Sequence, residues 1–232
     1  MKLKVFADGA DINDMLKAYN SGSVSGFTTN PTLMKRSGIT DYMAFAKEAL
    51  QNITDMPISF EVFSDELEEM ETQAYKLRDL AENVYVKIPV TNTKGVPTYD
   101  LINKLTSSGV KVNVTAIFTE NQIKNVSENI KNSTPSVISI FAGRIANTGI
   151  DPEPIMKFAV DLTRSNPEKE ILWASPREAL NIIQAERCGC DIITVTPDIL
   201  KAMDTFGKDL DEFSLETVKM FYDDACEAGF KI

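Results

Sequence analysis

A single lysine, Lys87, interrupts a run of β-branched and aromatic residues that extends from Val84 to Thr91. Strand interiors rarely hold lysine, because burying the ammonium group is costly unless the group is paired or loses its proton. Burial also lowers the pKa of a lysine amine and makes it a nucleophile toward carbonyl carbons. The alternative is a lysine on an edge strand, whose aliphatic stem lets the charge reach water. The stretch therefore indicates either imine chemistry or an exposed edge of a sheet.

Polar residues also end the other segments that have the pattern of strands. These residues are Asp8, Asn30, Glu61, Asn113 with Thr115, Ser139 with Phe141, and Ser175. Taken alone, each has a simpler explanation, since Asp8 fits a turn with Gly9, and Asn30 and Ser175 fit helix caps. In a barrel of parallel strands, however, the C-terminal strand ends meet at one face, where these groups would surround Lys87.

Two arginines, Arg144 and Arg177, follow the sixth and seventh of these segments. Arginine at a helix N-terminus opposes the helix dipole, so helix stability does not explain the position of Arg177. Ser175, Pro176 and Glu178 are typical of a helix start, whose free N–H groups bind anions. Together these groups predict a phosphate site, and the alternative is that both arginines only form surface ion pairs.

Short strand-like segments alternate with amphipathic helical segments along the whole chain. Strands are expected at residues 2–7, 24–27, 57–63, 84–91, 111–115, 136–141, 170–174 and 191–195. Helices are expected around residues 12–19, 41–50, 97–107, 155–162, 175–187 and 197–203, with a cap at Ser64, a capping box at Thr119 and Gln122, a polar loop at 143–151, and an additional C-terminal helix at about 214–227 that begins at Ser214.

Eight strand–helix pairs without a linker-like break predict a parallel sheet that closes into a (β/α)8 barrel. We expect one domain over residues 1–232, with the additional helix at its C-terminal end. The alternative is an open doubly wound sheet, but neither a Gly-x-Gly-x-x-Gly motif nor a phosphate-loop lysine motif supports it.

The composition narrows the chemistry further. The chain has 232 residues, a net charge of −10 and no histidine, so acid–base catalysis would depend on carboxylates, lysine, tyrosine or water. Its three cysteines fit neither a disulfide framework nor a zinc spacing, and no carboxylate cluster replaces histidine as a metal site. We expect no metal, no cofactor, no nucleic acid and no membrane partner, and a cytoplasmic location.

Seven short blocks, in the same order along the chain, resemble the transaldolase family of class I aldolases. The blocks are Ala7–Asp8, Gly26–Pro31, Val86–Pro89, Asn113–Thr115, Phe141–Arg144, Ala174–Arg177 and Gly189–Asp191. In length the chain resembles the short branch of that family, which also contains fructose-6-phosphate aldolase. It differs from the family pattern at Gly9-Ala10 and at Pro176.

The resemblance implies a role for each matching residue. Lys87 would form the Schiff base, Asp8 would be the acid/base on the sugar hydroxyl, and Glu61 with Thr115 would hold the catalytic water. The implied substrate-binding residues are Asn30, Asn113 and Ser139 for the dihydroxyacetone part, and Arg144, Ser175 and Arg177 for the phosphate.

Two positions bear on the reaction itself. Transaldolases resemble this chain in having the glutamate of Glu61 and the phenylalanine of Phe141, where fructose-6-phosphate aldolases have glutamine and tyrosine. A phenylalanine lacks the hydroxyl that would help water or a proton reach the three-carbon intermediate. The resemblance therefore favours transfer of that unit over its release, with Phe141 as a substrate-binding residue.

The expected activity is a transaldolase of the pentose phosphate pathway. It would move a dihydroxyacetone unit from sedoheptulose 7-phosphate or fructose 6-phosphate to glyceraldehyde 3-phosphate or erythrose 4-phosphate. The alternatives are an aldolase that releases free dihydroxyacetone, and a barrel that binds sugar phosphates without catalysis. The resemblance also implies a homo-oligomer, a ring of five or ten subunits.

Overall fold

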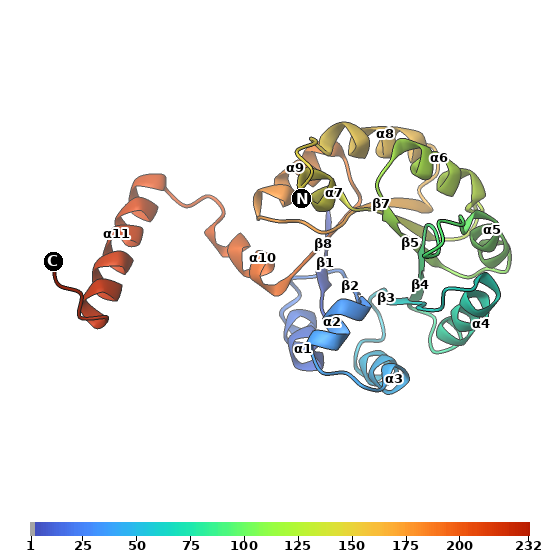
Figure 1. The fold of residues 1–232 in the computed structure, drawn as a ribbon, viewed down its shortest axis with the longest axis horizontal. Coiled ribbons are helices and arrows are strands. Elements are labelled where there is room, and N and C mark those ends of the chain that lie inside the picture. The colour runs from blue at the N-terminus through green and yellow to red at the C-terminus, as the bar shows by residue number, and fades with distance from the viewer. Residues whose placement is uncertain (1–2) are drawn as a thin grey trace. The chain divides into compact units, whose positions relative to one another are not determined.

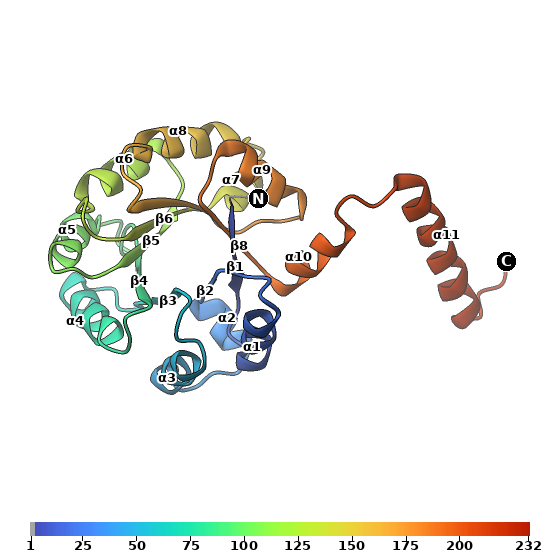
Figure 2. The ribbon, with the colours of Figure 1, turned by 180° about the vertical axis from the view of Figure 1, so that it is seen from behind.

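The computed structural model describes residues 3–232, so Lys2, the first residue of the first expected strand, lies outside the described residues. The chain divides into two compact units, with the boundary in the sequence between Leu200 and Lys201. In the first unit, eight parallel strands close into a barrel in sequence order, and helices follow each strand (Figures 1 and 2). The prediction of a (β/α)8 barrel is confirmed.

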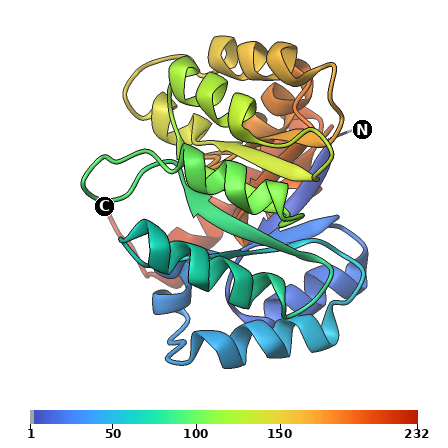
Figure 3. The same cartoon turned by 90° about the vertical axis from the view of Figure 1, so that its right-hand side faces the viewer.

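The strands are β1 (Lys4–Asp8), β2 (Gly26–Thr28), β3 (Ile58–Glu61), β4 (Val84–Pro89), β5 (Val112–Ile117), β6 (Ser136–Ile140), β7 (Lys169–Trp173) and β8 (Ile192–Val195). The helices are α1 (Ile12–Ser21), α2 (Pro31–Arg36), α3 (Tyr42–Asn52), α4 (Leu67–Arg78), α5 (Tyr99–Ser107), α6 (Glu120–Asn129), α7 (Ala142–Ala146), α8 (Glu153–Thr163), α9 (Leu180–Cys188) and α10 (Pro197–Ala202). Figure 3 shows helices of this unit lying along the outside of the strands.

The barrel interior is apolar at one level and polar at the next. The apolar level contains buried side chains from four strands and the residue after β7, namely Phe6, Val137, Leu172, Ala174 and Ile192. The ring of Phe6 lies against the neighbouring strand β2, where a Cβ on Gly26 would lie 2.6 Å from Cζ of Phe6. Tyr85 packs against this cluster, and Lys87 lies two residues further along β4, on the same face of the strand. The next level toward the C-terminal strand ends therefore begins with Lys87.

Two helix starts differ from the sequence prediction. Helix α4 begins after Glu66, and Ser64 donates its hydroxyl to Glu69 instead of capping the helix. The C-terminal helix begins after Asp209, whose side chain accepts backbone N–H bonds, so Ser214 lies inside the helix. An aspartate is as good an N-cap as a serine, and this one precedes Ser214 by more than a turn.

Two short helices were not expected from the sequence. Helix α7 occupies the start of residues 143–151, which were predicted to be a polar loop. Helix α2 follows β2 directly, because Asn30 accepts the N–H of Leu33 and Pro31 takes the first helical position. The capping box at Thr119 and Gln122 is confirmed at the start of α6.

The second unit, residues 201–232, contains a short 3-10 turn and helix α11 (Leu210–Glu227). This helix ends where the sequence predicted. Its large exposed apolar side chains are Leu210, Phe213, Leu215, Val218, Met220, Phe221 and Tyr222. In residues 3–232, no helix combines the length and the apolar character needed to cross a membrane.

Candidate active site

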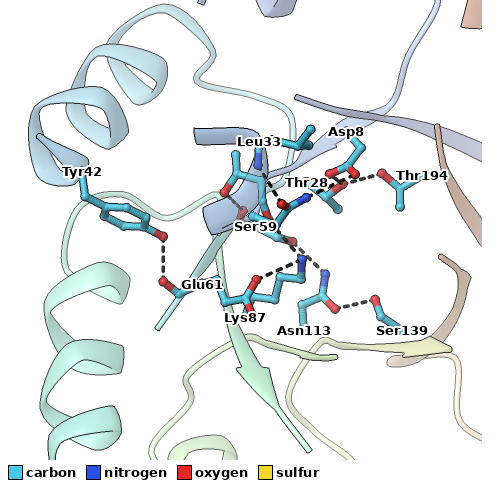
Figure 4. Close-up of polar contacts among 12 residues, drawn as sticks. Asp8, Thr28, Leu33, Tyr42, Ser59, Glu61, Lys87, Asn113, Ser139 and Thr194 are labelled. Atoms are coloured by element: carbon cyan, nitrogen blue, oxygen red, sulfur yellow. Dashed lines mark hydrogen bonds and ion pairs between the residues drawn. The ribbon is translucent and has the colours of Figure 1, made fainter. Parts of the chain in front are cut away.

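Lys87 lies inside the closed barrel and is 7% exposed. Its Nζ donates to the backbone oxygen of Thr29 at 3.0 Å and lies 3.3 Å from Oε2 of Glu61 (Figure 4). Strand β4 pairs with β3 on one side and β5 on the other, so the edge-strand alternative for this lysine is wrong. The amine is therefore buried, with one carboxylate and one carbonyl as partners.

Glu61 and Asn113 flank Lys87, because each is its register partner on a neighbouring strand. Asn113 donates from Nδ2 to Oγ of Ser59 at 3.0 Å. Ser139 donates its hydroxyl to Oδ1 of Asn113 at 2.6 Å. The amide of Asn113 is thus oriented by two hydroxyl groups, and three of the predicted residues are brought together with the lysine.

Glu61 is anchored from the helix layer by a tyrosine. Tyr42, the first residue of α3, donates its hydroxyl to the backbone oxygen of Glu61 at 2.7 Å. Burial raises the pKa of Tyr42 well above its usual range, so the phenol stays a donor. The Tyr42 ring also stacks edge-on against Phe60 and Phe63, which flank this part of the chain. The end of β3 is therefore held in place independently of the Glu61 carboxylate.

Asp8 is the last residue of β1, and its carboxyl group is hydrogen-bonded within the barrel. Its Oδ1 accepts the hydroxyl of Thr28 at 2.9 Å, and its Oδ2 lies 3.4 Å from Nδ2 of Asn30. Burial raises the pKa of Asp8, while the charge of Lys87 and the bonds from Thr28 and Asn30 act in the opposite direction. A carboxyl group in which these effects oppose one another is suited to accepting and returning a proton.

Thr115 lies at the end of β5, at a kink in the strand. The register of β5 against β6 shifts between Val114 and Ile117, and Ala116 has a φ of 60°. Oγ1 of Thr115 is buried and has no hydrogen-bond partner within residues 3–232. Such strain and unpaired polar atoms are concentrated at functional sites, so this hydroxyl is a candidate contact for substrate or water.

The residues predicted to bind phosphate lie on two segments in close contact. A Cβ on Gly143 in α7 would lie 1.6 Å from the backbone oxygen of Ser175, so only glycine allows this approach. In the amide orientation that satisfies both neighbours, Asn147 accepts from Nη2 of Arg177 at 3.1 Å and donates to the oxygen of Gly143 at 3.1 Å. Arg144, also on α7, lies next to Gly143.

Neither Arg144 nor Arg177 forms an ion pair with a carboxylate of the described chain, whereas Arg78, Arg164 and Arg187 each do. The described residues therefore give no support to the alternative that the first two are surface ion-pair residues. Their positive charges remain available for an anion.

The predicted helix start at Ser175 is also wrong. Helix α9 begins only at Leu180, because Ser175 takes a φ of 57° and directs the chain away from a helical path. The side-chain oxygen of Asn181 then accepts the backbone N–H groups of Arg177 and Glu178. These two amides are not free for a phosphate, so the anion site would depend on the arginine side chains.

Sequence reasoning assigned no role to four hydroxyl-bearing residues in or next to this site. These residues are Thr28, Tyr42, Ser59 and Thr194, of which Figure 4 shows the side chains. A usable signal was present for Thr194, since it is the one polar residue in the otherwise apolar strand β8. Asn147 and Asn181 carried no comparable signal.

A closed (β/α)8 barrel with a buried lysine paired to a carboxylate defines a class of lysine-centred barrel sites. The model of one family, described as Transaldolase/Fructose-6-phosphate aldolase, matches residues 5–232. The chain belongs to this family.

Curated relatives cover almost the same length. A probable transaldolase of Thermoanaerobacter sp. (strain X514) is 33% identical over 231 residues, which are 99% of this chain and 100% of the relative. A probable transaldolase of Caldicellulosiruptor saccharolyticus is 34% identical over 203 residues, 87% of this chain and 89% of the relative.

Two solved structures of low sequence identity resemble the chain in fold. A sialic acid aldolase of Ruminococcus gnavus has a TM-score of 0.56 at 12% identity and is matched over 84% of this chain and 68% of its own. A putative phosphonomutase of Burkholderia cenocepacia J2315 has a TM-score of 0.58 at 10% identity, with 88% and 91% covered.

Proposed function

We propose that this protein is a transaldolase that moves a dihydroxyacetone unit between sugar phosphates through a Schiff base on Lys87. The observation that carries the proposal is the buried Nζ of Lys87, 3.3 Å from Glu61 and 3.0 Å from the Thr29 oxygen, inside a barrel of this family. A buried amine next to proton-transferring carboxyl groups is what imine formation requires.

In the proposed reaction, Nζ of Lys87 attacks the C2 carbonyl of a ketose phosphate and the carbinolamine loses water to give the imine. Asp8 then accepts the proton of the C4 hydroxyl while the C3–C4 bond breaks, which releases an aldose phosphate. The remaining enamine attacks the carbonyl carbon of a second aldose, and Asp8 returns the proton to the new hydroxyl. Water, held by Glu61 and Thr115, finally hydrolyses the imine and frees Lys87.

The same proposal assigns the other side chains. Asn30, Asn113 and Ser139 hold the hydroxyl groups of the dihydroxyacetone part. Arg144, Arg177 and the Ser175 hydroxyl bind the phosphate, which anchors the sugar with its carbonyl toward Lys87. Donors such as fructose 6-phosphate or sedoheptulose 7-phosphate carry the phosphate at the end remote from C2, which fits this division of the site.

Transfer is favoured over release of free dihydroxyacetone by the residue at 141. The Phe141 ring lies 5.7 Å from the Phe118 ring and 5.4 Å from the Arg144 guanidinium carbon. It brings no hydroxyl to the intermediate, so nothing at this position would deliver a proton or water to the enamine. The intermediate would then persist until an aldose acceptor arrives.

Borohydride trapping tests the proposal. Reduction in the presence of fructose 6-phosphate, followed by peptide mass spectrometry, should find a three-carbon adduct on Lys87. Lys169 is an internal control, because it is 8% exposed and so almost as buried as Lys87. Lys87 left unmodified under these conditions would overturn the enzymatic proposal and favour a barrel that only binds sugar phosphates.

We also propose a homo-oligomer, in which the apolar side chains of α11 are covered by another copy of the chain. The short branch of the family suggests rings of five or ten subunits. Light scattering coupled to size-exclusion chromatography should give a mass several times that of the 25.7 kDa chain. A monomer at micromolar concentration would contradict this part of the proposal.

A further inference from the structure

The carboxyl group of Asp8 is held by a chain of two buried hydroxyl groups. Oγ1 of Thr28 lies 2.9 Å from Oδ1 of Asp8 and is also hydrogen-bonded to Oγ1 of Thr194 (Figure 4). Thr28 is 2% exposed and Thr194 is 6% exposed. The three residues come from the adjacent strands β2, β1 and β8 of the barrel, where Asp8 pairs with Thr28 and Phe6 pairs with Thr194.

Each hydroxyl group carries one proton, which fixes the donor and the acceptor in both hydrogen bonds. An ionised carboxylate only accepts, so Thr28 must give its single hydroxyl proton to Oδ1 of Asp8. The oxygen of Thr28 must then accept in its other bond, so Thr194 is the donor there. The order is therefore Thr194 to Thr28 to Asp8, with both hydroxyl protons committed.

We infer that Thr28 and Thr194 form a relay that reserves Oδ1 of Asp8 as an acceptor and leaves Oδ2 to exchange the proton with the substrate. The inference rests on the proposed function, in which Asp8 accepts and returns that proton. Both threonines are positioning residues, because they act through Asp8. When Oδ2 gains a proton, Oδ1 still accepts from Thr28, so the relay does not need to reorient during the reaction.

The electrostatic surroundings of Asp8 determine how strongly the relay affects its ionisation. The charged group that acts on Asp8 across the barrel is Lys87 from β4, which in turn pairs with Glu61 from β3. From β2 and the residues after it, Thr28 and Asn30 offer neutral donors, and β8 offers the neutral Thr194. Burial opposes ionisation of Asp8, and the hydrogen bonds from Thr28 and Asn30 favour it.

Loss of the Thr194 hydroxyl should therefore weaken the stabilisation of the ionised Asp8. Thr28 can still donate to Oδ1, but its oxygen loses a donor and its proton is less polarised. The carboxylate then takes up a proton at a higher pH, and the acidic limb of the kcat profile moves upward by about half to one pH unit. The KM for fructose 6-phosphate should stay within about twofold, because Thr194 does not touch the substrate.

The experiment compares Thr194→Val, which keeps the shape of the side chain, with Thr194→Ser, which keeps the hydroxyl. The valine variant should show the shifted limb and the serine variant the wild-type profile. Thr163→Val is the matched control, since Thr163 is also 6% exposed and its hydroxyl donates within α8, to the backbone oxygen of Ala159. A valine variant whose limb stays in place, or a serine variant that behaves like valine, would overturn the inference.

Thr28→Val provides the second variant, and its limb should move further, because it removes the direct donor to Asp8. It decides the matter if Thr194→Val does not fold. Borohydride trapping on the same preparations separates this inference from the proposed function. Trapping of Lys87 with an unshifted pH profile overturns the relay alone, whereas wild-type protein that cannot be trapped overturns the function itself.

Discussion

Lys87 and Lys169 are buried almost equally, at 7% and 8% exposure, but lie in different surroundings. Lys87 has the Glu61 carboxylate and a ring of polar side chains within the barrel interior. Lys169 is the first residue of β7, at the opposite end of the barrel strands, and donates to the backbone oxygen of Ser127 at 2.7 Å.

Lys169 thereby supports the last turn of α6, whose carbonyl groups favour a cation. Burial lowers the pKa of Lys169 although this lysine lies away from the candidate active site, so a lowered pKa does not by itself mark a catalytic lysine. The difference lies in what surrounds the amine. A reactive lysine also needs a proton acceptor, donors for the substrate hydroxyls and an anchor for the electrophile.

The largest expected effect distinguishes Lys87 from Lys169 by their contributions to kcat/KM. Lys87→Met should lower kcat/KM for transfer by on the order of 10⁴-fold, because no other group can form the imine. Lys169→Met should leave kcat/KM within about twofold, since this lysine only supports a helix end. Both are measured by coupled detection of the released aldose phosphate, with circular dichroism as the control for folding. Equal losses in two folded variants would mean that the surroundings of Lys87 are not special.

The next largest effect is expected for Arg177, which we propose binds the phosphate of the substrate. Arg177→Gln should raise the KM for fructose 6-phosphate by about 10- to 100-fold, because a charge-assisted hydrogen bond to the phosphate is lost. Its kcat should change much less. Arg164→Gln is the matched control, since Arg164 is paired with Asp161 on the surface. If KM rises equally in both variants, or in neither, the assignment of Arg177 to the phosphate is wrong.

A smaller effect concerns how long Lys87 keeps its three-carbon unit. Glu61→Gln combined with Phe141→Tyr should raise the ratio of dihydroxyacetone release to transfer by about tenfold, because a phenol near the enamine can deliver a proton. Release is measured without an acceptor, by enzymatic reduction of free dihydroxyacetone. Phe118→Tyr is the control, since it adds the same hydroxyl to the neighbouring ring. An unchanged ratio would remove positions 61 and 141 from the explanation.

The barrel and the ring around Lys87 could be predicted because they depend on patterns that the sequence states outright. The alternation of strands and helices fixes a parallel barrel, and a barrel brings all C-terminal strand ends together. Glu61, Lys87 and Asn113 could thus be placed near one another before their register was known, and the observed register pairs both Glu61 and Asn113 with Lys87.

The features that the sequence did not predict depend on backbone dihedral angles and on side-chain partners far away in the sequence. Ser175 followed by Pro176 is typical of a helix start, but the left-handed φ of Ser175 is compatible with no helical turn, and α9 begins later. Thr194 is separated from Thr28 by 166 residues, so only the closed barrel brings their hydroxyls together. Local sequence carries no signal for such a contact.

The smallest effect is one of stability, and it comes from Asp8. Burial raises the pKa of Asp8 above its ordinary value of 3.8. At pH values between 3.8 and the raised pKa, the folded protein therefore binds more protons than the unfolded chain. Stability therefore falls as pH rises through that window, and the loss is complete above it. Asp8→Asn cannot ionise and should melt at a higher temperature than wild type at neutral pH, with the difference vanishing in acid.

Thermal melting of both proteins from about pH 3 to pH 8 tests this, with Asp65→Asn as a control of opposite sign. The backbone N–H and hydroxyl of Thr93 lower the pKa of Asp65, so its contribution is present at neutral pH and is lost as pH falls. Asp65→Asn should thus melt at a lower temperature than wild type at neutral pH. Lower stability of Asp8→Asn at neutral pH would mean that Lys87 and Thr28 outweigh the burial of Asp8, so that this carboxylate supports the fold as well as the proposed chemistry.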